Sequence, residues 1–87
     1  MSVFFTHIVS KNGLAKDPEG QKHDGLGEAR IAALGAARSL IVEEVRRGHD
    51  SVKFELLIED EYHVEVGRLP VSAEVTGLSA ITDLPNR

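Results

Sequence analysis

The chain has 87 residues, no cysteine and a formal net charge of −4, from 14 acidic and 10 basic side chains. This length allows one small core, and the absence of cysteine excludes disulfide staples, thiolate nucleophiles and cysteine-based zinc sites. The acidic balance disfavours a nucleic-acid partner, because negative charge is repelled by the phosphate backbone.

No basic leader followed by a long apolar run opens the sequence, and no stretch approaches the roughly 20 apolar residues of a membrane helix. We therefore expect a cytoplasmic protein that has no membrane partner. Because a small cysteine-free core is marginally stable, we also expect oligomer formation to add stability.

The first predicted element is a strand over residues 3–9, where aromatic and β-branched side chains are concentrated. Residues 11–13 have the composition of a turn, and residues 14–16 can pair back on the strand. Residues 17–20 contain a Pro and a Gly that end this pairing. The beginning of the chain is therefore predicted to be a short hairpin.

A helix is predicted from about Gly25 to Arg47, where Ala, Leu, Glu and Arg dominate. Asp24 is placed to cap its N-terminus, and Gly48 is placed to end it. Six apolar side chains fall within an arc of about 120° and are predicted to pack on the sheet. They are Leu26, Ala29, Ala33, Ala37, Leu40 and Ile41.

Residues 51–59 alternate between apolar and polar side chains, which predicts a strand with one buried face. The acidic residues 59–61 then turn the chain, and Pro70 is expected to end the following strand. Two sets of side chains are predicted to alternate inward on these strands: Val52, Phe54, Leu56 and Ile58 on the first, and Tyr62, Val64 and Val66 on the second.

The predicted fold class is α+β, with the order ββαββ and a small antiparallel sheet that carries one amphipathic helix on one face. Residues 1–75 are predicted to form a single domain. Residues 76–87 form a C-terminal tail that we expect to be partly disordered.

Several short motifs are similar to those of a known family. They are Phe4-Phe5-x-His7, Asp17-x-Glu19-Gly20, Ala36-Ala37-Arg38, the turn at Asp60, and Leu69-Pro70-Val71-Ser72. In order and spacing they resemble a small bacterial family, common in rhizobia and their relatives, that is catalogued as a domain of unknown function. The resemblance implies a compact ββαββ domain and no particular activity. The chain departs from this family at His63, where a Gly is usual in the last hairpin, and at Gly25, where a capping Asp is usual.

The four histidines are not spaced as ligands on one helix face, so the sequence does not predict a metal site. His7 is expected to be partly buried and hydrogen-bonded to backbone, whereas His23 and His49 are expected at the surface. The acidic residues 59–61 lack the frame of a calcium loop and are predicted to be a solvated hairpin tip. We predict no catalytic residue, no metal ligand and no cofactor.

The leading functional hypothesis is a non-enzymatic interaction module that works as a homodimer or binds another protein. One helix covers one face of a sheet, whereas residues 3–9 carry apolar side chains toward both faces. A partner, or the tail with its three apolar residues Leu78, Ile81 and Leu84, would have to cover the second face.

The predicted interface combines that second face with a stripe on the back of the helix. A glycine within a helix costs about 1 kcal/mol relative to alanine, and the close approach of another chain or of the tail would explain its presence. Simple exposure of isolated apolar residues is the alternative. The predicted interface residues are Ile31, Gly35, Arg38 and Val42 on the helix, and Val3 and Phe5 on the first strand.

Two further hypotheses come from other functional classes. An antitoxin-like regulatory partner would use its acidic surface to bind a basic effector, and co-purification with a basic protein would favour this role. A small metal-dependent enzyme is the third hypothesis, and a stoichiometric metal ion in the purified protein would favour it.

Overall fold

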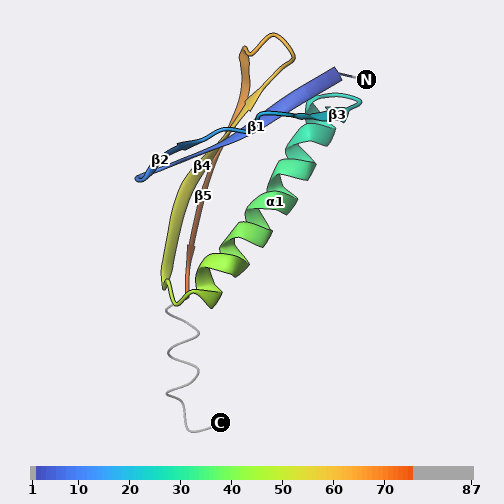
Figure 1. The fold of residues 1–87 in the computed structure, drawn as a ribbon. Coiled ribbons are helices and arrows are strands. Elements are labelled where there is room, and N and C mark those ends of the chain that lie inside the picture. The colour runs from blue at the N-terminus through green and yellow to red at the C-terminus, as the bar shows by residue number, and fades with distance from the viewer. Residues whose placement is uncertain (1, 76–87) are drawn as a thin grey trace, which may run out of the picture.

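The computed structural model describes residues 2–75, and the predicted tail at residues 76–87 lies outside the described residues. The elements in chain order are β1 (Ser2–Ser10), β2 (Gly13–Ala15), β3 (Gln21–His23), α1 (Leu26–Arg46), β4 (Ser51–Glu59) and β5 (Glu65–Glu74). The strands form one antiparallel sheet in the order β2-β1-β4-β5, with β3 paired to the start of β1 (Figure 1). The α+β class and the antiparallel sheet with one helix are confirmed.

The prediction missed β3, so the observed order is βββαββ. This strand is only three residues long, and its sequence, Gln-Lys-His, has no apolar alternation. Its position comes from pairing with β1, in which Phe4 faces Gln21. The predicted short hairpin is present as β1 and β2, joined by a two-residue turn in which Ser10 pairs with Gly13.

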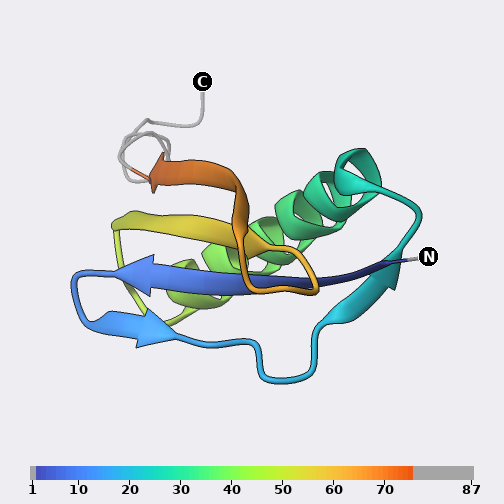
Figure 2. The ribbon, with the colours of Figure 1, turned by 90° about the horizontal axis from the view of Figure 1, so that it is seen from above.

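Helix α1 lies across one face of the sheet (Figures 1 and 2). Ala29, Ala33 and Ala37 are at most 3% exposed, because these small side chains let the helix backbone approach β4 closely. Leu26, Leu40 and Ile41 are half-buried against the same core. The predicted packing face of the helix is confirmed, and so is the buried face of β4, formed by Val52, Phe54, Leu56 and Ile58.

The two ends of α1 differ in how their backbone groups are satisfied. The expected Asp24 cap is wrong, because Gly25 is the N-cap and makes no side-chain capping hydrogen bond. Instead, the carboxylate of Glu28 accepts a hydrogen bond from the backbone N–H of Asp24 at 3.1 Å. At the other end Gly48 has a φ of 93°, and the chain leaves the helix there as predicted.

The predicted course of the last strand is wrong. Tyr62 and Val64 lie exposed in the turn, and β5 runs through Pro70 instead of ending there. The strand tolerates Pro70 because β5 is an edge strand, so the missing N–H need not cost a ladder hydrogen bond. Residues 71–74 continue the strand beyond Pro70.

Val66 packs against the core as predicted, but a register shift at the start of β5 reverses the predicted alternation after it. Ile58 pairs with Gly67 whereas Glu59 pairs with Glu65, so Val66 is an extra residue. Beyond this bulge the odd-numbered side chains of β5 share the face of Ile58, and the even-numbered ones point away from α1. No helix in the described part of the chain is both long and apolar enough to cross a membrane.

Candidate interaction surface

The side of α1 that faces away from the sheet carries several exposed apolar side chains. Ile31 is 72% exposed, Val42 is 49% exposed and Leu34 is 41% exposed. At 100° per residue they share one side of the helix with the exposed residues Gly35 and Arg38. We call this set the outer stripe, and it consists of Ile31, Leu34, Gly35, Arg38 and Val42.

The outer stripe contains all four helix residues of the predicted interface and adds Leu34, which the sequence reasoning missed. Leu34 follows Ile31 by three residues, and this helical spacing could have placed it on the same side of the helix. A methyl group on Gly35 would be surrounded by open space, because, apart from the adjoining residues and the helix's own backbone, no heavy atom of residues 2–75 would lie within 4 Å of it. The surface at Gly35 is therefore open, and within residues 2–75 no neighbouring segment requires a glycine there.

The charges around the outer stripe differ between its two ends. Glu28 lies in the first turn of α1, and Arg46 lies in the last turn. Both project from the same flank of the stripe, about 60° from Ile31 around the helix axis. Among the described residues, no carboxylate lies within ion-pair distance of Arg38. The stripe is thus acidic toward one end and basic at its centre, and its other end is flanked by Arg46, which lies 3.6 Å from Glu43.

The two predicted interface residues on β1 have a different environment, because their own chain contacts them. Val3 and Phe5 are half-buried. A Cβ on Gly20, in the loop between β2 and β3, would come within 2.8 Å of Val3 and 3.0 Å of Phe5. The ring of Phe5 also stacks on His63, with 4.5 Å between ring centroids. A loop and a turn thus cover part of the sheet face that α1 leaves free.

His7 connects this loop and turn to the sheet, and it is only 5% exposed. The backbone N–H of Asp17 donates to Nδ1 of His7 at 3.0 Å. Because Nδ1 is the acceptor, we assign the ring proton to Nε2, which donates to Glu59 at 2.9 Å. The predicted buried, backbone-bonded histidine is confirmed, and neither ring nitrogen remains free for a ligand.

Glu59 and Asp60 have structural partners, whereas Glu61 is exposed, so the predicted solvated tip is present only in part. Hydrogen bonds from His7 and His63 lower the pKa of Glu59, because they stabilise its charged form. Asp60 closes the turn by accepting the backbone N–H groups of Tyr62 and Val64, at 2.8 and 3.0 Å. Within residues 2–75 no cluster of three or more His, Asp and Glu side chains is arranged to hold a metal ion.

The other two histidines lie at opposite ends of α1. The side chain of His23 is 15% exposed and lies near the Phe4 ring, so its predicted surface position is wrong. His49 is at the surface as predicted, and its Nδ1 is 2.6 Å from a carboxylate oxygen of Glu44. Both side chains therefore have local structural partners.

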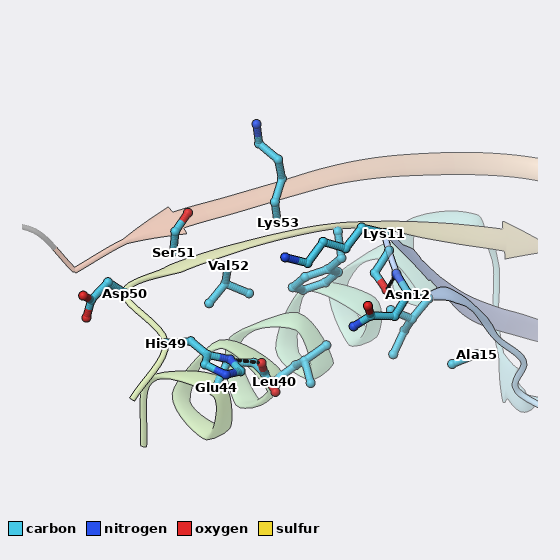
Figure 3. Close-up of a pocket in the computed structure, with 13 residues that line it drawn as sticks. Lys11, Asn12, Ala15, Leu40, Glu44, His49, Asp50, Ser51, Val52 and Lys53 are labelled. Carbon is cyan, nitrogen blue, oxygen red and sulfur yellow. Dashed lines mark hydrogen bonds and ion pairs between the residues drawn. The ribbon is translucent and has the colours of Figure 1, made fainter. Parts of the chain in front are cut away.

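A cleft of about 610 Å³ opens between the end of α1, the turn joining β1 to β2, and the start of β4 (Figure 3). Leu40, Val52 and Phe54 form apolar parts of its wall. Its polar lining includes both Lys11 and Glu44, and the latter already pairs with His49 and Arg47. This mixed charge favours no one class of ligand.

The sequence model of the family DUF6894, a domain of unknown function, matches residues 3–72 of the chain. The chain belongs to this family. The predicted resemblance to a domain of unknown function is thereby confirmed, and the DUF6894 match includes both the outer stripe and the His7 hydrogen bonds. No curated protein and no solved structure matches the chain.

Proposed function

We propose that this DUF6894 domain is a non-enzymatic, cytoplasmic interaction module that associates with a second copy of itself through the outer stripe of α1. The observation that carries the proposal is the exposure of Ile31, Leu34 and Val42 on one side of a helix whose opposite side is already packed. Single exposed apolar residues are common on protein surfaces. Three on one side of the same helix, on either side of Gly35 and Arg38, gather apolar surface of the kind that marks interaction sites.

The size of the helix sets the strength of this association. The 21 residues of α1 make a rod about 31 Å long, and the outer stripe occupies about 16 Å of it. One such helix per partner buries less than the roughly 800 Å² of a standard interface. The dimer is therefore weak, and its population depends on protein concentration.

Two observations support a binding role over catalysis. His7, the buried histidine, uses one ring nitrogen to hold a loop and the other to bind Glu59. Asp60 is occupied by two backbone N–H groups of its own turn. These polar groups stabilise the fold, whereas the outer stripe presents apolar surface without a described partner.

Sedimentation equilibrium at several protein concentrations tests the proposal. The wild type should show a reversible monomer–dimer equilibrium, and Val42→Glu should stay monomeric because dimerisation would bury an unpaired charge. Ala36→Glu is the matched control, since it adds the same charge at an exposed position away from the stripe. A monomeric wild type, or a dimer that is indifferent to Val42→Glu, contradicts the proposal.

A further inference from the structure

Four of the five outer-stripe residues are arranged symmetrically along the helix, and Leu34 is the exception because Ser39 occupies its symmetry position. Ile31 and Val42 lie at equal distances, about 8 Å, on either side of the point midway between Ala36 and Ala37. Gly35 and Arg38 also lie at equal distances from that point, about 2 Å on either side. A twofold axis through this point, perpendicular to α1, therefore sets Ile31 against the partner's Val42 and Gly35 against the partner's Arg38.

Resting on the self-association proposed above, we infer that the two copies pair with their α1 helices antiparallel about this axis. Figures 1 and 2 show no described segment over the outer side of α1 that would obstruct a second helix. A twofold interface presents the same patch from both copies, so each residue pairing occurs twice. The helices thus meet along the full length of the outer stripe.

Side-chain size favours this register. Arg38 is the longest side chain in the outer stripe, and Gly35 has no side chain at all. In the antiparallel pair each Arg38 lies beside the bare backbone at Gly35 of the other copy, so the two Arg38 side chains are offset by about 4.5 Å along the axis instead of lying directly opposite each other. The same arrangement brings the two β-branched residues, Ile31 and Val42, into contact across the interface.

Charge distinguishes the antiparallel from the parallel arrangement. A parallel pair would bring each end level with its own like charge, Glu28 with Glu28 and Arg46 with Arg46, so it would gain no attraction between opposite charges. The two Arg38 side chains come close in both arrangements and do not distinguish them. The antiparallel pair instead brings Glu28 to Arg46 at both ends, with a mismatch of about 1.5 Å along the axis. Both residues lie on the same flank of the stripe, which is the geometry that a twofold axis requires.

Disulfide trapping tests the orientation, because the wild type has no cysteine and each introduced thiol is the only one in its chain. Ile31→Cys and Val42→Cys are oxidised separately and as a mixture of folded proteins, and covalent dimers are identified by mass spectrometry. In the antiparallel pair, identical positions lie about 16 Å apart along the axis. A disulfide spans Cα atoms no more than about 7 Å apart. We expect the mixed dimer to dominate and each variant alone to remain largely uncrosslinked.

Arg30→Cys mixed with Glu43→Cys is the control. Like Ile31 and Val42, these two exposed positions are centred on the point midway between Ala36 and Ala37, but they lie on opposite flanks of α1. Equal trapping in this control and in the test mixture would show that the outer stripe is not the face through which the helices pair, and would overturn the inferred pairing. Dimers formed by each stripe variant alone would show a parallel pair, and would overturn the orientation while leaving self-association intact.

Sedimentation of the wild type separates failure of this inference from failure of the proposed function. If no disulfide forms and the wild type is monomeric, both the antiparallel pairing and the proposed self-association are contradicted. This is also the result expected if residues 76–87 of the same chain cover the outer stripe. No trapping together with a dimeric wild type overturns the antiparallel pairing and moves the interface to another surface.

Discussion

The backbone N–H of Asp17 donates a hydrogen bond to Nδ1 of His7, a residue ten positions earlier in the chain. The Asp17 side chain accepts in turn from the backbone N–H of Thr6 at 3.2 Å. These bonds fill the stretch of the β1 edge between its pairings with β2 and β3. A polar loop thereby completes the edge of the sheet where no strand pairs with it.

Replacing His7 tests the contribution of this contact to stability. We predict that His7→Phe lowers the free energy of unfolding by about 1–3 kcal/mol, because the Asp17 N–H loses its acceptor while a ring still fills the site. Urea unfolding followed by circular dichroism measures the change. His49→Gln, at an exposed histidine, should change stability by less than about 0.5 kcal/mol. Equal stability of His7→Phe and the wild type would contradict the structural role of His7.

The lowered pKa of Glu59 predicts a dependence of stability on pH. Its ordinary value is 4.5, and hydrogen bonds from His7 and His63 lower the pKa in the folded state. A carboxyl group of this kind stabilises the fold fully above its unfolded pKa, and the contribution is lost as the pH falls through the folded pKa. The stability difference between the wild type and Glu59→Gln should therefore shrink between about pH 6 and about pH 3.

Urea unfolding at several pH values measures this difference, with Glu61→Gln as the control at an exposed neighbouring carboxyl group. The control should show a smaller pH-dependent difference from the wild type than Glu59→Gln does. A difference for Glu59→Gln that stays constant across the range would mean that Glu59 has no special interaction in the folded protein.

His63 combines a strained backbone with a favourable ring contact. Its φ is 63°, a left-handed conformation that costs a non-glycine residue about 1–2 kcal/mol. Its ring stacks on Phe5 and approaches Glu59 at 3.2 Å. Both His63→Ala and His63→Gly remove the ring, but only glycine relieves the strain.

We therefore predict that His63→Gly is more stable than His63→Ala by about 1 kcal/mol, after allowing for the greater entropy of glycine in the unfolded chain. Thermal and urea unfolding of the two variants measure this order directly. If alanine proves as stable as glycine, the left-handed conformation at this turn is not maintained in solution.

Gly35→Ala should change the stability of a single copy and the affinity between two copies in opposite directions. In one copy the new methyl group projects into open space, so alanine should raise stability by about 0.5–1 kcal/mol through its greater helix propensity. In the dimer the same methyl group lies under Arg38 of the other copy and should weaken association. Unfolding at low concentration and sedimentation at high concentration measure the two effects. A variant that gains stability and also dimerises more tightly would argue against close approach at Gly35.

The sequence by itself determined the buried faces of α1 and β4. Ala29, Ala33 and Ala37 recur every four residues, and the inward side chains of β4 recur every two. Within a regular element the backbone geometry alone decides which side chains share a face, and the apolar face is the one that leaves water. No knowledge of the neighbouring element was needed for this prediction.

The tertiary structure alone decided the phase of β5 and the partners of His7. The extra residue Val66 reverses the inside and outside of every position that follows, and the pairing of β5 with β4 reveals it. His7 finds Glu59 across 52 residues of chain. A strand register and a side-chain hydrogen bond each depend on a second segment brought close by folding, and no local period in the sequence encodes that proximity.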